Sequence, residues 1–199
     1  MISNLAPINK IIPLSTVDGL GARTSIFLQG CNISCAYCHN PETQRLCNSC
    51  GECTNVCPVK ALYFKNGKVS WNDKTCIGCD ECIKICPNFA SPKIKYMSPG
   101  QVIDIVKENM PFIRGITVSG GECMLYPEFL TELFELAHQI DLTCFIDSNG
   151  TKDFSGYPEL VKNTDGVMLD VKSWDKEVYR VLTNNRDDEI VKKNILFLA

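Results

Sequence analysis

The sequence of 199 residues has no long apolar run, no run of basic residues and no recognisable signal segment. A membrane-spanning helix needs about 20 mostly apolar residues, and the apolar runs here are far shorter, so we expect no membrane contact. Binding to nucleic acid usually requires a basic patch, whereas 20 basic and 23 acidic residues leave a net charge of −3. We therefore expect no nucleic acid partner. The lack of a charged segment followed by an apolar one at the N-terminus favours a cytoplasmic location.

Cysteine, by contrast, is abundant, with 13 in a chain of otherwise ordinary composition. In a reducing compartment cysteines bind metals or take part in redox chemistry more often than they form disulfides. Eleven of them lie between residues 31 and 86, where they form three groups. This clustering predicts metal binding.

Two of the groups repeat one another. The pattern C-x2-C-x2-C-x3-C-P occurs twice, offset by 29 residues, and it is the spacing of a bacterial two-cluster ferredoxin. Because the fourth cysteine of each run binds the other cluster in such ferredoxins, the spacing predicts one [4Fe-4S] cluster on Cys47, Cys50, Cys53 and Cys86 and another on Cys76, Cys79, Cys82 and Cys57. Between the runs, two strand-like pieces flank Asn66-Gly67, a hairpin turn. A pair of structural zinc sites is the alternative, although zinc needs no trailing Cys-Pro.

The first group, Cys31, Cys35 and Cys38, offers three thiolates instead of four. A cubane held by three cysteines leaves one iron open to a small ligand. Two alternatives stay open on spacing alone. Cys123 or Cys144 could complete a third ferredoxin-like cluster, or the three cysteines could be structural.

The surrounding residues resemble a known family. C-x3-C-x2-C with Tyr37 before the last cysteine resembles the radical S-adenosylmethionine (SAM) enzymes. The stretch VDGLGARTSIFLQGCNISCAYCHNP (residues 17–41), together with TVSGGE, DSNG and MLDVK, resembles the glycyl-radical-enzyme activating enzymes, to which the pyruvate formate-lyase-activating enzyme belongs. CGECTNVCPVKAL, FIRGITVSGGE and DGVMLDVKSWD are most similar to YjjW-type activases. The family usually has DGPG where this chain has DGLG, a minor departure.

The resemblance implies a reaction and a set of site residues. The reaction is reductive cleavage of SAM, followed by removal of a hydrogen from a glycine of a partner glycyl radical enzyme. The implied cofactors are SAM, three [4Fe-4S] clusters and a monovalent cation, with flavodoxin or a ferredoxin-type protein as electron donor. The implied catalytic residues are Cys31, Cys35, Cys38 and Lys172, and the implied cofactor-binding residues are Tyr37, Gly120, Gly121, Glu122, Asp147, Met168 and Asp170.

Apolar periodicity predicts an α/β fold. Four short apolar runs, at 24–29, 116–119, 143–147 and 167–171, are typical of buried parallel strands. Helices are expected after the capping box at Ser98, after Pro127, and at the chain end after Asp187 or Asp188. His138, Cys144 and the aromatic side chains of Trp71, Phe112 and Phe145 are expected to pack, and His39 either to pack or to tune a cluster.

By the resemblance, the fold is a partial (β/α) radical SAM barrel with four of its six strands. Its core comprises residues 1–42 and 92–199, and a ferredoxin-like insert comprises residues 43–91. The next strand is expected shortly after Ala199, so we expect the chain to be part of a longer activase. Three alternatives remain: another radical SAM enzyme with auxiliary clusters, a chain that only binds clusters or carries electrons, and a zinc-binding module.

Overall fold

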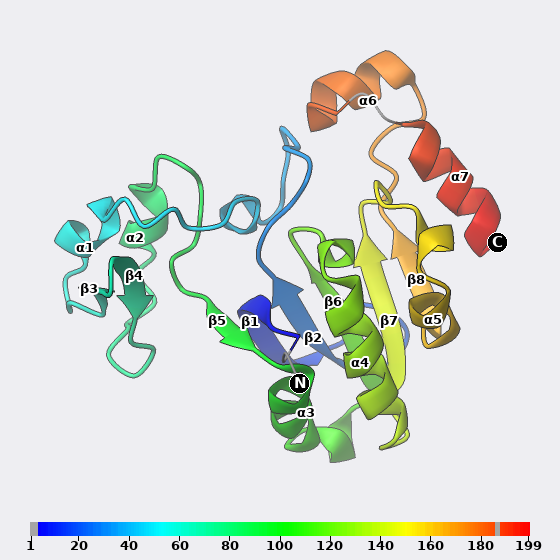
Figure 1. Cartoon of the computed structure of the whole chain (residues 1–199), viewed down its shortest axis with the longest axis horizontal. Coiled ribbons are helices and arrows are strands. Elements are labelled where there is room, and N and C mark those ends of the chain that lie inside the picture. Colours follow the sequence, from blue (N-terminus) through cyan, green and yellow to red (C-terminus); the bar gives the residue numbers. More distant parts are fainter. Residues whose placement is uncertain (1–3, 186–187) are drawn as a thin grey trace.

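A computed structural model describes residues 4–185 and 188–199 and shows one large sheet covered by helices, with a smaller lobe beside it (Figure 1). The centre of the sheet is parallel and contains the four predicted strands, each within two residues of its expected bounds. Apart from Thr143, the side chains of these strands are buried or half-buried. These strands are β2 (Arg23–Leu28), β6 (Gly115–Gly120), β7 (Thr143–Ser148) and β8 (Gly166–Leu169).

Two further strands, which the sequence analysis did not predict, extend the sheet on its β2 side. β1 (Ala6–Ser15) pairs antiparallel with β2, and β5 (Lys95–Met97) pairs antiparallel with β1. The sheet is therefore mixed, with the order β5-β1-β2-β6-β7-β8. β1 contains Pro7 and Pro13 and two register shifts against β2, so its apolar residues do not alternate as those of a regular strand do.

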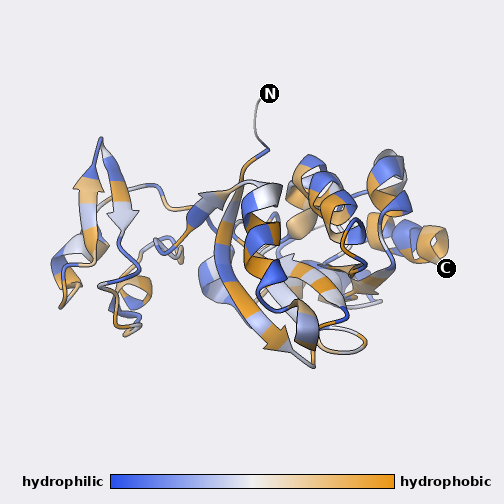
Figure 2. Cartoon of the chain, turned by 90° about the horizontal axis from the view of Figure 1, so that it is seen from below, coloured by the Kyte–Doolittle hydropathy of each residue, from blue (hydrophilic) through white to orange (hydrophobic). Residues whose placement is uncertain are grey.

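Helices pack on the sheet and enclose the core. Ser98 accepts a hydrogen bond from the Gln101 backbone and the Gln101 side chain returns one to the Ser98 backbone, which confirms the predicted capping box. Apolar residues gather on the strands and on the helix faces that cover them (Figure 2). Phe112 is 70% exposed, so its predicted packing is wrong. The helices of this part are α3 (Pro99–Lys107), α4 (Pro127–His138), α5 (Pro158–Lys162), α6 (Lys176–Thr183) and α7 (Glu189–Leu198), with 3-10 turns η1 (Pro41–Thr43), η2 (Met110–Phe112), η3 (Cys123–Leu125) and η4 (Phe154–Gly156).

The last helix begins after Asp188, as predicted, but the side chain of Asp188 does not cap it. Instead the carboxylate pairs with Lys192 at 2.7 Å, one turn along the helix. Asp187, the other predicted cap, lies outside the described residues. No helix among the described residues has the length and apolarity required to span a bilayer.

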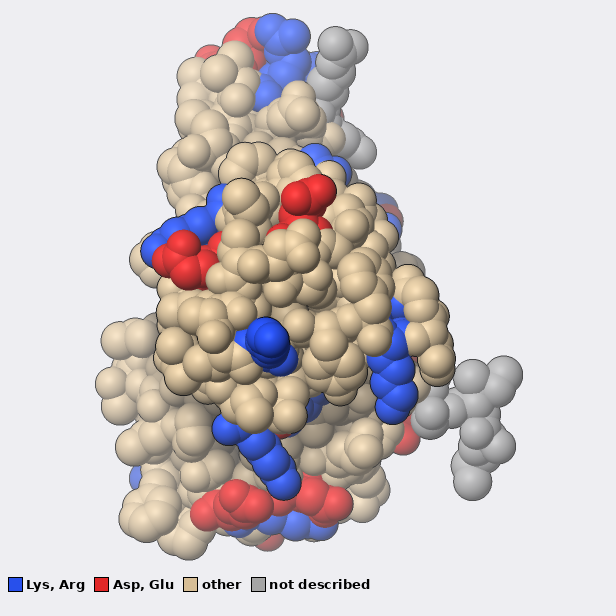
Figure 3. Space-filling model, turned by 90° about the vertical axis from the view of Figure 1, so that its left-hand side faces the viewer, with Lys and Arg blue, Asp and Glu red and all other residues tan. Residues whose placement is uncertain are grey.

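The smaller lobe comprises most of residues 43–91 and has its own hydrophobic cluster, formed by Cys53, Leu62 and Cys82. The predicted hairpin around Asn66-Gly67 is present as two paired strands. On the face that this lobe presents, acidic and basic side chains are interspersed and form no large patch of one sign (Figure 3). Its elements are α1 (Glu52–Val56), β3 (Leu62–Lys65), β4 (Lys68–Trp71) and α2 (Glu81–Lys84).

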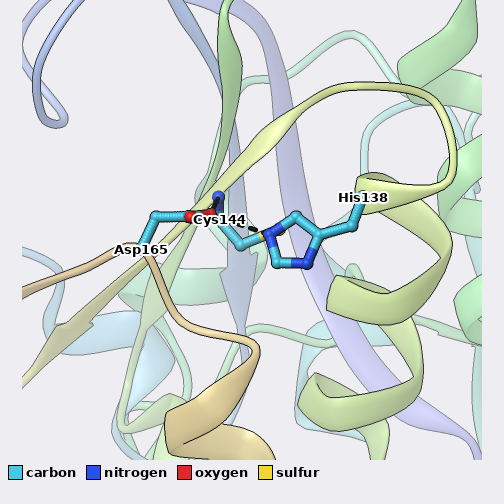
Figure 4. Close-up of side chains that lie close together, drawn as sticks. All are labelled: His138, Cys144 and Asp165. Atoms are coloured by element: carbon cyan, nitrogen blue, oxygen red, sulfur yellow. Dashed lines mark hydrogen bonds and ion pairs between the residues drawn. The ribbon is translucent and has the colours of Figure 1, made fainter.

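His138 has a structural role at the amino ends of the strands. Its Nε2 lies 2.8 Å from Asp165 Oδ2, and the same oxygen accepts a hydrogen bond of 2.7 Å from the Cys144 backbone N–H (Figure 4). The Cys144 thiol lies within reach of both side chains, but it is fully buried and faces the carbonyls of Phe134 and Leu142. Asp165 therefore ties α4 to β7 and β8 through hydrogen bonds.

Candidate functional site

The three cysteines of the first group meet at the carboxyl ends of the parallel strands. They follow β2 and line a cavity of about 450 Å³. Ligands of open α/β sheets bind at this edge because the connecting loops converge there. The cavity brings together eight of the predicted site residues: Cys31, Cys35, Cys38, Gly120, Gly121, Asp147, Asp170 and Lys172.

Backbone hydrogen bonds from distant segments hold the cysteine loop. The N–H groups of Ser34 and Ala36 donate to the carbonyls of Thr183 and Leu182 at the end of α6, at 2.9 and 2.8 Å. The Cys31 N–H donates to Gln44 O at 2.8 Å. These bonds pair backbone N–H groups of the loop with two segments that follow it in the sequence. They therefore fix the position of its three sulfurs.

Gly120 and Gly121 are required where β6 passes the end of β2. A Cβ atom on Gly120 would lie 2.2 Å from Leu28 O, and one on Gly121 would lie 2.1 Å from Gly30 O. Gly120 also has a φ of +116°, which side-chain-bearing residues rarely adopt. These glycines let the GGE segment run against the start of the cysteine loop, so they shape the cavity wall whatever ligand it holds.

Two carboxylates line the cavity in addition to Asp170. Asp147 on β7 accepts a hydrogen bond of 2.7 Å from Ser119, and Asp18 accepts one of 2.6 Å from Ser25. Burial raises the pKa of Asp147, the hydrogen bond from Ser119 opposes this, and the nearby negative charges of Asp170 and Asp18 raise it further. A cation in the cavity would relieve this repulsion.

Lys172 supplies the positive charge of the site. Its ammonium group pairs with Asp170 and lies 5.5 Å from the centre of the Tyr37 ring. Burial lowers the Lys172 pKa, but the hydrogen bond and charge of Asp170 outweigh this, so the pKa is raised overall. Lys172 therefore stays charged beside Cys35, whose pKa burial raises and the lysine lowers.

Three predicted residues lie outside the cavity lining. Glu122 is 1% exposed, and its carboxylate accepts hydrogen bonds from Met124 N, Ser148 Oγ and Asn149 N at 2.8–3.0 Å. Burial raises its pKa to about 7, although these donors lower it. Tyr37 is half exposed and donates to Lys172 O at 3.4 Å, and Met168 lies on β8 opposite Asp147.

Asn149 and Asp18 line the cavity but were not singled out from the sequence. The Asn149 side-chain amide lies 3.6 Å from Cys31 Sγ and donates toward it. Both residues belong to the quoted motifs VDGLG and DSNG, where a polar residue precedes or follows a strand end next to glycine. A polar residue beside a glycine at a strand end was the feature of the sequence that could have indicated both residues. His39 lines the same cavity, which agrees with a tuning role more than with packing.

The thiols have the chemistry of a metal site. Burial raises the Cys31 pKa to about 11, a backbone hydrogen bond at Ile33 lowers it, and the charges of Glu122, Cys35 and Cys38 raise it again. Without metal the Cys31 thiol is protonated at neutral pH, and a bound metal ion or cluster would take it as a thiolate with release of a proton. Three convergent sulfurs, a lysine and carboxylates therefore fit a three-cysteine cluster beside a charged ligand.

Four of the eight cysteines of the smaller lobe line one cavity. A second, smaller cavity is lined by Cys57 together with Cys76, Cys79 and Cys82, the combination that the repeat predicted. Backbone N–H groups donate to sulfur at equivalent places in the two halves, from Ala61 to Cys57 at 3.2 Å and from Ala90 to Cys86 at 3.4 Å. For Cys57 the backbone donors outweigh the effect of burial and lower the pKa, which favours the thiolate.

Comparison with known proteins identifies the family. The model of the radical SAM superfamily matches residues 25–198. The chain belongs to the radical SAM superfamily. Membership of this superfamily implies a [4Fe-4S] cluster and SAM as cofactors.

Curated relatives within the superfamily have related names. A Haemophilus influenzae protein named among the glycyl-radical enzyme activating enzymes is 33% identical over 83% of this chain and 47% of its own length. The trans-4-hydroxy-L-proline dehydratase activating enzyme of Clostridioides difficile is 32% identical over 92% of this chain and 65% of its own length. The pyruvate formate-lyase-activating enzyme of Clostridium pasteurianum is 31% identical over 88% and 56%. The chain thus spans about half to two thirds of the length of these relatives. Among solved structures, QueE from Escherichia coli matches 75% of this chain and 55% of its own, with a TM-score of 0.46 and 19% identity.

Proposed function

We propose that this chain carries the catalytic core of a glycyl-radical-enzyme activating enzyme. The observation that carries the proposal is the convergence of Cys31, Cys35 and Cys38 with Asp147 and Lys172 in one cavity. The names of the relatives and the VDGLG, CHNP and DSNG motifs support an activase over another radical SAM enzyme. The substrate is then a glycine on a partner glycyl radical enzyme.

Different residues of the cavity would bind the cluster and SAM. Cys31, Cys35 and Cys38 would hold the [4Fe-4S] cluster. When bound, that cluster supplies the electron that cleaves SAM, and the resulting 5′-deoxyadenosyl radical takes a hydrogen atom from the partner's glycine. Gly120 and Gly121 let the backbone approach SAM closely.

The charged side chains order the cavity. Lys172, held by Asp170 and Tyr37, places a positive charge beside Cys35 and, by the family resemblance, would lie near the sulfonium of bound SAM. Asp147 and Asp170 lie where a monovalent cation would offset their repulsion, with Met168 beside them on β8. Glu122 contributes by fixing the loop that carries Ser148 and Asn149, since its carboxylate accepts from both.

The insert (residues 43–91) would bind two auxiliary [4Fe-4S] clusters. The gathering of Cys57 with Cys76, Cys79 and Cys82 supports crossed ligation between the two repeats. With these clusters the chain holds three in total, and the core comprises residues 1–42 and 92–199. A flavodoxin or ferredoxin-type protein is the proposed electron donor, in an anaerobic cytoplasm.

The test is cleavage of SAM by the reconstituted chain. Anaerobic protein with about 12 irons, as three cubanes require, should form 5′-deoxyadenosine when reduced and mixed with SAM. Cys35→Ala should abolish the product and leave about eight irons. Cys144→Ala is the matched control, because its thiol packs in the core at the other end of the sheet, and it should keep both. Twelve irons without 5′-deoxyadenosine would contradict the proposal.

A further inference from the structure

An indole N–H without a partner lies in the insert. Trp71 ends β4 and pairs with Leu62 across the hairpin. Its Nε1 atom is fully enclosed, and no atom of the described residues accepts a hydrogen bond from it. A buried tryptophan N–H normally finds an acceptor, because leaving the donor unpaired costs free energy.

The surroundings of Trp71 indicate which acceptor is missing. Trp71 lines the second cavity together with apolar side chains, four cysteines, Lys93 and two carboxylates. The two carboxylates there have other partners, since Asp80 pairs with Lys93 and Glu81 with Lys84. The same cavity is lined by the four-cysteine set, Cys57, Cys76, Cys79 and Cys82, whose sulfurs can accept a hydrogen bond.

The indole ring is held in place on its other side. The Lys95 ammonium lies 5.8 Å from the ring centre and pairs with Asp73. The Asn72 N–H donates to Ala61 O at 2.8 Å, which closes the hairpin beside the cavity. The hairpin and the contact with Lys95 thus hold Trp71 beside the cavity through groups other than the cysteines.

We propose that Trp71 Nε1 donates a hydrogen bond to a sulfur of the cluster held by Cys57, Cys76, Cys79 and Cys82. The inference rests on the auxiliary clusters of the proposed function. A hydrogen bond to sulfur stabilises the reduced cluster, which carries more negative charge, and raises its reduction potential.

The bond would make the two auxiliary clusters unequal. The repeat offset of 29 residues places Gly100 at the position equivalent to Trp71. Gly100 lies in α3, outside the insert, and has no side chain. The cluster on Cys47, Cys50, Cys53 and Cys86 therefore has no matching donor, and the cluster beside Trp71 is the more oxidising of the pair.

The test uses the full chain with Cys31, Cys35 and Cys38 replaced by alanine, so that only the insert contributes iron signals. Trp71 and Trp174 are the only tryptophans. Trp174 lies outside the insert, and its side chain is 65% exposed. W174F therefore leaves Trp71 as the single indole, and W71F is its matched counterpart. Each protein is reconstituted with iron and sulfide, labelled with ¹⁵N in the indole, and titrated with dithionite.

In W71F one of the two midpoint potentials should shift to a more negative value and the other should stay, whereas W174F should shift neither. Electron–nuclear double resonance of reduced W174F should show coupling of the indole ¹⁵N–H to a cluster. This measurement tests the hydrogen bond even if W71F loses iron, because W174F keeps Trp71. About eight irons without this coupling in W174F would overturn the role of Trp71 alone. Fewer irons in W174F would overturn both the proposal of two auxiliary clusters and the role of Trp71.

Discussion

Arg23 should be among the side chains on which the fold depends most. It is 1% exposed and lies on β2, the strand that leads to the cysteine loop. Its guanidinium donates to Thr117 Oγ1, to the carbonyls of Leu20 and Ile116, and to both Oγ1 and the carbonyl of Thr143, at 2.7–3.2 Å. Its Cζ also lies 3.8 Å from the centre of the Phe145 ring.

The cost of replacing Arg23 follows from these contacts. Arg23→Met keeps most of the volume but removes every donor, so the carbonyls of Ile116 and Thr143 lose a charged partner inside the protein. Each buried polar group left unpaired costs about 1–3 kcal/mol, and two to three such groups give a loss of roughly 4 kcal/mol. This is a large part of the roughly 5–15 kcal/mol that stabilises a typical domain.

The assay is urea unfolding of anaerobic proteins with equal iron content. With a slope of about 2 kcal/mol per molar urea, Arg23→Met should lower the midpoint by about 2 M. Arg180→Met is the control, because Arg180 is half exposed and pairs with Glu177 within one helix, where such pairs contribute about 0.5 kcal/mol or less. A loss below about 1 kcal/mol for Arg23→Met would refute the reasoning.

Three further predictions concern the site. Burial raises the pKa of Glu122 to about 7 from an ordinary 4.5, so the folded state binds this proton more tightly than the unfolded chain does. The contribution of Glu122 to the free energy of unfolding is therefore complete below pH 4.5 and is lost as the pH rises through 7. The loss is roughly 3 kcal/mol in all and about 1 kcal/mol between pH 6 and 8. Urea unfolding at those two pH values should show this slope in the wild type and lose it in Glu122→Gln, and a wild-type slope of opposite sign would contradict it. Asn149→Ala removes the donor to Cys31 and should shift the potential of the three-cysteine cluster to a more negative value with iron content unchanged, as titration followed by electron paramagnetic resonance would measure; an unchanged potential would exclude the bond. Removal of iron by a chelator should unfold the insert, whose own core is small, and leave the large sheet folded; rapid proteolysis confined to residues 43–91 would show this, and equal protection of both parts would argue against it.

The parallel strands were predictable because each is a short apolar run whose side chains are mostly buried or half-buried. Their sequences need no partner to be recognised, and the glycines and acidic residues at their ends indicated the cavity. β1 was missed because Pro7 and Pro13 and its register shifts hide the alternation. β5 is too short to form a pattern, and it is a strand only because β1 lies beside it.

The site could be predicted as far as sequence motifs define it. Cys31, Cys35, Cys38, Asp147 and Lys172 line one cavity, and Cys57 lines another with Cys76, Cys79 and Cys82; that these sets bind clusters stays a prediction. The inward orientation of Glu122 was not predictable, because it depends on Ser148 and Asn149 from another strand. The sequence indicated only packing for Trp71, since nothing local marks its N–H as unpaired.

The contact between α6 and the cysteine loop has a consequence for how the protein is made. Ser34 and Ala36 donate to the carbonyls of Thr183 and Leu182, so the ribosome must pass Thr183 before the loop is held. The eight cysteines of the insert all lie before residue 87, and their neighbours are local in sequence. Iron loading during synthesis would therefore proceed in a fixed order, with the insert first and the SAM site last.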